Sequence, residues 1–196
     1  MNFDINTLIQ QLAIQLPPLL FALTVHELAH GWVAFRLGDP TAKMAGRLTM
    51  NPLKHLDPLG VLAFVIMKIG WAKPVPVDPR YFRNPQKDML LVALAGPGAN
   101  VLLALASALL ARVLVSVPVL PLFVLQPLVG MLEASVWINI MLAVFNIIPI
   151  PPLDGSKVLM GVLPPEAARS FPRIAPFGSF LLLALFSTGV RGGLIL

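Results

Sequence analysis

The chain has 196 residues, of which 57% are hydrophobic and 12% are charged. An ordinary soluble domain carries about 25% charged residues, and a soluble protein of this length needs more polar surface than these residues supply. The composition therefore excludes a disordered chain, a domain that binds nucleic acid through a solvated basic face, and most soluble enzymes. It indicates an integral membrane protein, whose net charge of +5 is typical of basic cytoplasmic loops.

The chain contains no cysteine, which excludes disulfides and thiolate metal sites. Any metal ion must be held by His, Asp or Glu. The 20 prolines predict breaks between or within the apolar segments. The N-terminus lacks the basic n-region and the cleavage site of a secretory signal, so we expect no part of it to be removed.

Four long apolar stretches predict an all-α membrane protein with about four transmembrane helices, built as a single membrane-embedded domain over residues 1–196. A spanning helix needs about 20 apolar residues. The stretches cover residues 5–37, 89–117, 122–150 and 174–190. We expect Pro17-Pro18 to break the first of them, which leaves residues 19–37 as the span.

Residues 38–87 form the longest connection. Within it, the apolar residues 59–71 are too few for a comfortable span and predict a re-entrant or interfacial hairpin. Residues 47–50 and 75–77 lie beside turn residues and predict short β segments. A second connection, residues 151–173, follows the third span.

Basic residues predict the orientation. Nine of the fourteen lie between residues 36 and 87, and three more lie between residues 151 and 173. The positive-inside rule then places both connections in the cytoplasm and both termini on the other side. We therefore expect a multi-pass protein of the inner (plasma) membrane, with any site near these connections on the cytoplasmic side.

Three ionisable residues lie close together in the first stretch, in the string His26-Glu27-Leu28-Ala29-His30. Side chains four residues apart share a helix face, so both imidazoles can reach one metal ion. Glu27 can lie beside a metal-bound water, as in the H-E-x-x-H arrangement of zinc peptidases. A glutamate is costly inside a membrane span, which favours a metal site over the alternative, a satisfied polar cluster that packs helices.

A catalytic zinc takes three protein ligands and keeps a fourth position for water. The candidates for the third ligand are Glu133, Asp154 and His55. Asp154 follows a segment with three prolines, and such irregular backbone is tolerated at membrane depth where it lines a polar cavity. The predicted topology brings this segment to the same leaflet as His30, so Asp154 is the predicted third ligand. The alternative is an aspartate that caps a helix beginning near Gly155.

Further sequence strings accompany the H-E-x-x-H string. Together they resemble the site-2 protease family of intramembrane zinc metalloproteases, in particular the small bacterial group without PDZ or CBS domains. The matching strings are residues 24–31, 46–52, 55–60, 70–77, 95–100 and 145–155. They cover most of the chain between residues 20 and 165.

The resemblance implies one zinc ion per chain, held by His26, His30 and Asp154, with Glu27 as the general base and acid. It also implies that Asn100 lies near the scissile carbonyl, where it could donate to the developing oxyanion. The alternative for Asn100 is a hydrogen bond between helices, and the Gly96-Pro97-Gly98 run could serve close helix packing alone.

Other residues of the matching strings are weaker candidates. Asn146 and Pro149 match positions that shape the substrate region. His55 matches a family position, where an interfacial hydrogen bond is favoured over zinc ligation. Glu133 departs from the pattern, and a water-facing position is its simplest interpretation.

The resemblance implies a protease that cleaves transmembrane helices of membrane-anchored substrates, which releases regulators or clears signal-peptide remnants. The implied partners are a transmembrane substrate and the lipid bilayer, without nucleic acid. The β segments at 47–50 and 75–77 could pair with an unwound stretch of substrate. The alternatives are an inactive or transport-type zinc-binding membrane protein, and a protease of the prenyl-protein peptidase type, against which Leu153-Asp154-Gly155 argues.

Overall fold

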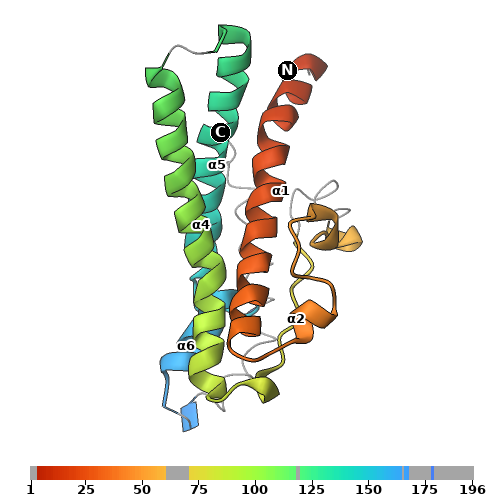
Figure 1. Cartoon of the computed structure of the whole chain (residues 1–196), viewed down its shortest axis with the longest axis vertical. Helices are drawn as coiled ribbons and strands as arrows, with labels where there is room; N and C mark the ends of the chain where they lie inside the picture. Colours follow the sequence, from red (N-terminus) through yellow and green to blue (C-terminus); the bar gives the residue numbers. More distant parts are fainter. Residues whose placement is uncertain (1–3, 61–70, 118–119, 165, 168–177, 179–196) are drawn as a thin grey trace.

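Three long helices form the body of the molecule in the computed structural model, which describes residues 4–60, 71–117, 120–164, 166, 167 and 178 (Figure 1). These helices are α1 (Ile5–Arg36), α4 (Pro85–Ser116) and α5 (Leu122–Asn146), and each is long and apolar enough to cross a membrane. They lie side by side along the long axis of Figure 1, and each packs against the other two. Three of the predicted spans thus correspond to helices long and apolar enough to cross a membrane. The fourth, residues 174–190, lies outside the described residues apart from residue 178.

The first helix is continuous. Asp4 caps its N-terminus by accepting hydrogen bonds from the backbone N–H of Asn6 (3.0 Å) and the hydroxyl of Thr7 (2.7 Å). The predicted break at Pro17-Pro18 is wrong, because α1 runs through both prolines to Arg36. Proline removes one intrahelical hydrogen bond, but neighbouring helices and local backbone adjustments compensate for such losses within membrane helices.

Small residues line the seam where the three helices meet. The buried positions include Ala22 of α1, Ala93 and Ala104 of α4, and Ala143 of α5. Large apolar side chains point outward instead, as with Trp137, which is 69% exposed. Small residues let membrane helices approach closely, while lipid covers the outward side chains.

The connection between α1 and α4 wraps around the lower part of α1 in Figure 1. It contains the short helix α2 (Thr41–Met44) and two 3₁₀ turns, η1 (Pro52–Lys54) and η2 (Pro79–Tyr81). The fully buried carboxylate of Asp39 ties its two ends together, since it accepts backbone N–H bonds from Thr41 (2.9 Å) and Asp78 (2.7 Å).

The described part of this connection contains neither of the predicted β segments. Residues 47–50 and 75–77 do not form strands, and the pairing found is a single antiparallel bridge between Leu56 and Ala72. The Lys73 N–H donates to the His55 carbonyl (2.8 Å) beside this bridge. The two ends of the predicted re-entrant hairpin are therefore held together, while residues 61–70 between them lie outside the described residues.

The last described helix is α6 (Asp154–Val162), which packs against α4. The segment between α5 and α6 contains consecutive turns and a cis peptide bond between Pro151 and Pro152. This proline-rich segment ends the predicted third span at Asn146, four residues before the expected end at residue 150. It brings Asp154, the first residue of α6, back to the lower half of α1.

Candidate metal centre and active site

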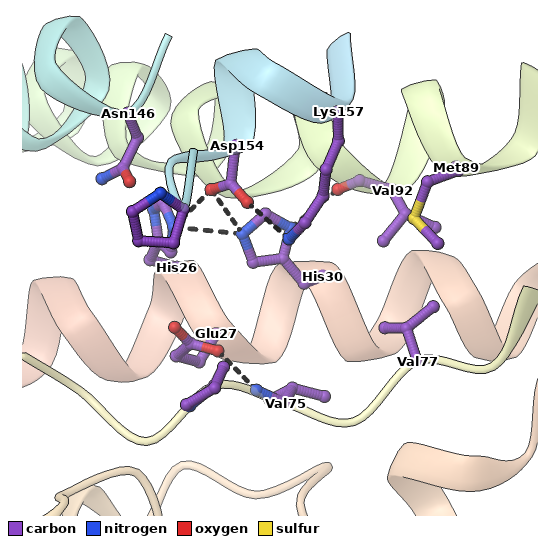
Figure 2. Close-up of a pocket in the computed structure, with 12 residues that line it drawn as sticks. His26, Glu27, His30, Val75, Val77, Met89, Val92, Asn146, Asp154 and Lys157 are labelled. Carbon is purple, nitrogen blue, oxygen red and sulfur yellow. Dashed lines mark hydrogen bonds and ion pairs between the residues drawn. The ribbon is translucent and has the colours of Figure 1, made fainter. Parts of the chain in front are cut away.

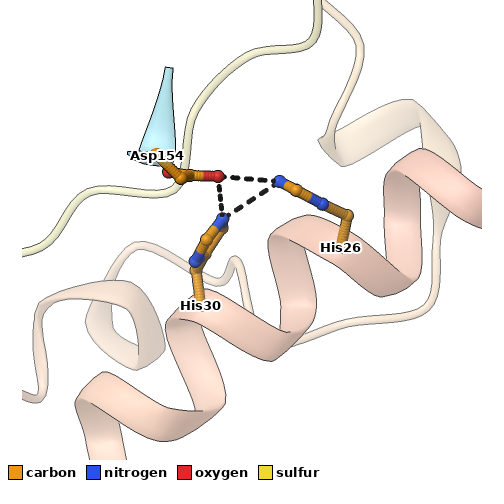
Figure 3. A group of neighbouring side chains, drawn as sticks. All are labelled: His26, His30 and Asp154. Carbon is orange, nitrogen blue, oxygen red and sulfur yellow. Dashed lines mark hydrogen bonds and ion pairs between the residues drawn. The ribbon is translucent and has the colours of Figure 1, made fainter. Parts of the chain in front are cut away.

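Three potential metal ligands converge between α1 and the start of α6. The Nε2 atoms of His26 and His30 lie 3.0 Å apart, because four residues is about one helical turn. The Oδ2 atom of Asp154 lies 3.1 Å from the His26 Nε2 and 3.0 Å from the His30 Nε2. Figure 3 shows the resulting triangle of ligand atoms, and all three residues are buried.

The Nδ1 atoms of both imidazoles lie beside carbonyl oxygens. The Nδ1 atom of His26 lies 2.5 Å from the side-chain oxygen of Asn100, and the Nδ1 atom of His30 lies 2.7 Å from the backbone oxygen of Val92. A carbonyl oxygen only accepts hydrogen bonds, so each Nδ1 carries the proton in the neutral ring. Each Nε2 therefore presents a lone pair to the Asp154 carboxylate and to the other ring.

This donor set fits a divalent cation. Three lone-pair atoms face one another at 3.0–3.1 Å, an arrangement that is repulsive unless a cation or a proton lies among them. Ligands of a tetrahedral zinc, at 2.0–2.1 Å from the metal, lie about 3.3 Å apart. Two imidazoles and one carboxylate also match the ligand types of open zinc sites, which leave a fourth position for water or substrate.

Gly96 of α4 forms the seat for both rings. A Cβ atom built on Gly96 would lie 2.6 Å from the Cε1 atom of His30 and 2.7 Å from the Cε1 atom of His26, and it would clash with the His30 Nε2. Only glycine lets the α4 backbone approach the two imidazoles this closely. The Gly96-Pro97-Gly98 run thus does more than pack helices, because its first glycine makes room for the ligand cluster.

Lys157 favours the ionised form of the Asp154 carboxylate. Burial raises the pKa of this carboxyl, while the positive charge of Lys157 lowers it. The Lys157 ammonium lies 3.2 Å from Oδ1, which leaves Oδ2 for the triangle. Lys157 was not among the predicted residues, although its position three residues after Asp154 on a helix is a signal that sequence analysis could have used.

A cavity of about 260 Å³ opens beside the cluster. Its lining combines the three ligand candidates, Glu27, the end of α5 and the connection before α4. The lining residues are His26, Glu27, His30, Pro74, Val75, Val77, Met89, Val92, Asn146, Pro152, Asp154 and Lys157.

Glu27 is the one acidic residue besides Asp154 among those lining residues. Its Oε2 atom accepts a hydrogen bond of 2.8 Å from the backbone N–H of Val75. Figure 2 shows Glu27 turned toward the segment that contains Val75, while the two imidazoles turn toward Asp154. The hydrogen bond fixes one carboxylate oxygen and couples this residue to the chain at 73–77.

Arg47 also holds the segment of residues 73–77. Its guanidinium is buried and donates to the carbonyl oxygens of Lys73 (2.6 Å) and Pro74 (3.2 Å). Residues 73–77 thus contribute to the cavity wall and have two anchors, Arg47 at the carbonyls of Lys73 and Pro74 and Glu27 at the Val75 N–H. The sequence predicts β segments at residues 47–50 and 75–77, and the structure instead links Arg47 through its side chain to the two residues before the second segment.

Asn100 lies between α1, α4 and α5, where it forms the hydrogen bonds between helices that were its alternative role. Its oxygen accepts from His26, and its nitrogen donates to the Asn139 oxygen (2.7 Å) and to the Ala22 carbonyl (3.4 Å). Asn100 is not among the residues that line the cavity. The amide therefore supports the back of the His26 imidazole.

The three weaker candidates, Asn146, Pro149 and His55, lie in different surroundings. Asn146 lines the cavity, and its side chain also donates to the Leu142 carbonyl of its own helix (2.9 Å). Pro149 does not line the cavity, whereas Pro152 of the same segment does. His55 is fully buried outside the ligand cluster and donates from Nε2 to the Thr49 carbonyl (2.9 Å).

Glu133 lies in a second hollow, far along α5 from the ligand cluster. It is exposed there, among small residues of α4 and α5 and beside Gln15 of α1. Glu133 therefore lies outside the metal centre, and its water-facing position stays a prediction.

The chain also matches known proteins. The model of peptidase family M50 matches residues 121–185, which include α5, the proline-rich segment and α6. The curated protein "Putative zinc metalloprotease YwhC" of Bacillus subtilis (strain 168) is 39% identical over 174 residues, which are 87% of this chain and 78% of the relative. The chain belongs to peptidase family M50, the site-2 protease family of zinc metalloproteases.

More distant members of the family match as well. "Putative zinc metalloprotease Rip2" of Mycolicibacterium smegmatis is 31% identical over 175 residues, 86% of this chain and 64% of the relative. Rip2 of Mycobacterium tuberculosis (strain H37Rv) is 30% identical over 183 residues, 89% of this chain and 66% of the relative. The chain thus spans about two thirds of the length of these two M50 relatives. No solved structure matches it significantly.

Membership of family M50, together with three helices able to span a bilayer, makes this chain a multi-pass membrane metalloprotease.

Proposed function

We propose that the chain is an intramembrane zinc metalloprotease that hydrolyses peptide bonds within transmembrane segments of membrane-anchored substrates. The substrates would be anchored regulatory proteins or signal-peptide remnants. The observation that carries this proposal is the triangle of three lone-pair atoms, 3.0–3.1 Å apart, contributed by α1 and α6. A polar cluster of this kind between apolar helices is costly without a function.

In this proposal His26, His30 and Asp154 hold one zinc ion per chain. Bound zinc lowers the pKa of its water to about 7 and polarises a carbonyl group. Glu27 accepts the proton of the attacking water and later delivers it to the leaving amine. Its support is its place in the cavity wall and the Val75 N–H that orients its carboxylate.

The substrate segment would lie extended along residues 73–77. A transmembrane helix hides its carbonyl groups in its own hydrogen bonds, so it must unwind locally before it is cut. Residues 73–77 contribute to the cavity wall and are held by Arg47, which supports a rigid guide for an unwound strand. Asn146 and Pro152 would line the same path from the side of α5.

The remaining predictions belong to this proposal. The peptidase domain would extend over residues 1–196, with a fourth span at 174–190. The distribution of basic residues supports a bacterial inner-membrane location with the cavity toward the cytoplasm. Water would then reach the cluster from the cytoplasmic side, between α6 and the connection before α4.

The test compares the purified wild type with Glu27→Gln and Asp154→Asn in zinc content and in cleavage of a model transmembrane peptide. Glu27→Gln should keep about one zinc per chain and lose cleavage, because it retains the ligands and removes the base. Asp154→Asn should lose both. Wild type that binds zinc and carries it across vesicles without cutting the peptide would favour the transport alternative and reject the proposal.

A further inference from the structure

A chain of hydrogen bonds runs from the back of His26 into the seam between α4 and α5. The His26 Nδ1 contacts the Asn100 oxygen at 2.5 Å, and the Asn100 nitrogen donates to the Asn139 oxygen at 2.7 Å. The Asn139 nitrogen donates to the Ser135 backbone carbonyl at 2.8 Å and contacts the Ser135 hydroxyl at 3.2 Å. That hydroxyl lies 2.8 Å from the hydroxyl of Ser107.

The direction of this chain is fixed at its far end. A backbone carbonyl only accepts, so the side of Asn139 that faces the Ser135 carbonyl must be its NH₂ group. The Asn139 oxygen therefore faces Asn100 and requires the NH₂ group of Asn100. The Asn100 oxygen is then left for His26, which must donate from Nδ1 and keep Nε2 as a lone pair.

Burial makes this arrangement costly to reverse. Asn100 and Asn139 are 0% exposed, and Ser107 and Ser135 are 6% exposed. A flipped amide would place two donors or two acceptors against each other at every link, and a buried unsatisfied polar group costs about 1–3 kcal/mol. Water cannot correct the mismatch inside a seam packed between apolar helices.

We propose that Asn139 is a positioning residue that acts through Asn100 to hold His26 in its metal-binding tautomer. The inference rests on the proposed function only in treating His26 as a zinc ligand. His30 is set separately by the Val92 carbonyl of α4, so the two imidazoles depend on different supports. Loss of the Asn139 side chain leaves the longer contact with the Ala22 carbonyl (3.4 Å) to orient the Asn100 amide. The amide can then turn its NH₂ group toward His26, which places the imidazole proton on Nε2.

Two substitutions at this position separate orientation from packing. Asn139→Leu keeps the branching and the number of side-chain heavy atoms and removes both polar atoms. Asn139→Asp keeps an oxygen acceptor for Asn100 in either protonation state, and its protonated form can still donate to the Ser135 carbonyl. Thr24→Val is the matched control, since Thr24 is also buried but its hydroxyl donates only to the Leu20 carbonyl of its own helix (2.7 Å) among the contacts found.

The experiment uses the full chain in detergent or nanodiscs with zinc as the probe. Competition with a chromophoric chelator measures zinc affinity, the ring ¹⁵N shifts of labelled histidine report the tautomers in the metal-free protein, and thermal unfolding reports stability. The chain has three histidines, so the His26 signals can be assigned by substituting His30 and His55 in turn.

Asn139→Leu should weaken zinc binding by about 10- to 100-fold, the usual effect of removing an outer partner of a ligand, and should shift the His26 proton from Nδ1 toward Nε2. Asn139→Asp should restore both readouts, and Thr24→Val should leave both unchanged. Unaltered His26 tautomer and zinc affinity in Asn139→Leu would overturn the inference. Wild type that binds no zinc would refute the proposed function, while the tautomer measurement would still decide the role of Asn139.

Discussion

The seat at Gly96 offers the sharpest test of the ligand geometry. Gly96→Ala adds one methyl group at a point that lies 2.6 Å from the His30 Cε1 and 2.7 Å from the His26 Cε1. Carbon atoms in contact prefer separations of about 3.5–4.0 Å. The methyl group must therefore push one ring, or the α4 backbone, by roughly 1 Å.

A displacement of this size is large for a metal site. Ligand distances must stay within about 0.2 Å of their ideal values, so the three ligand atoms cannot all reach one zinc after the shift. A misplacement of about 1 Å in a catalytic site can cost about 100-fold in rate, which is about 2.7 kcal/mol of transition-state stabilisation. We expect Gly96→Ala to lower the cleavage rate by at least this factor and zinc affinity by about tenfold or more.

Gly98→Ala is the matched control. It makes the same substitution two residues further along α4, where an added Cβ meets nothing within 4 Å. Alanine is favoured over glycine in a helix by about 1 kcal/mol, so this variant should fold at least as well as wild type and keep zinc and activity. Chelator competition, cleavage of a model transmembrane peptide and thermal unfolding of the metal-free protein give the three readouts.

The reasoning fails if Gly96→Ala binds zinc and cleaves substrate like Gly98→Ala. In that case the imidazoles do not rest against α4 as described. A variant that loses zinc binding while its metal-free form melts like wild type supports the described seat.

Three further predictions concern the connection and the metal. Arg47→Ala should lower cleavage by about tenfold with zinc content unchanged, because the carbonyls of Lys73 and Pro74 lose a charged donor worth about 1.5–3 kcal/mol; equal loss of zinc would point to a different role. Asp39→Ala should lower the free energy of unfolding by about 3 kcal/mol, measured in denaturant, since two partly buried N–H groups lose a charged acceptor; a change under 1 kcal/mol would contradict this. Removing zinc with a chelator should lower the melting temperature, and adding zinc should restore it, as mass action requires of a ligand that binds the folded state; identical melting curves would argue against the site.

Much of the fold and the centre of the site could be predicted from local patterns. Runs of about 20 apolar residues gave α1, α4 and α5, and the spacing of His26 and His30 predicted their shared helix face. Asp154 followed from the small number of acidic residues in or beside apolar segments and from the topology. Each of these predictions uses either a short-range periodicity or a simple count, and both can be read directly from a sequence.

The parts that sequence analysis missed depend on contacts between distant segments. Pro17-Pro18 was expected to break α1, but packing against α4 and α5 decides the path of a proline-containing membrane helix. Asn100 is 74 residues from His26, and only the register between α1 and α4 places its amide behind the ring. Residues 75–77 have strand-like composition, yet no neighbouring strand pairs with them among the described residues.

The two imidazoles are supported by different kinds of partner, and this has a consequence for the evolution of the site. His30 relies on the backbone carbonyl of Val92. A substitution of the Val92 side chain keeps this carbonyl unless it changes the path of the backbone. His26 relies on a side chain, Asn100, whose orientation depends in turn on Asn139. The partner behind the His26 ring is therefore the one that a side-chain substitution can remove directly, and variants that lose an Nδ1 partner should arise more readily through the seam between α4 and α5 than through the Val92 carbonyl of α4.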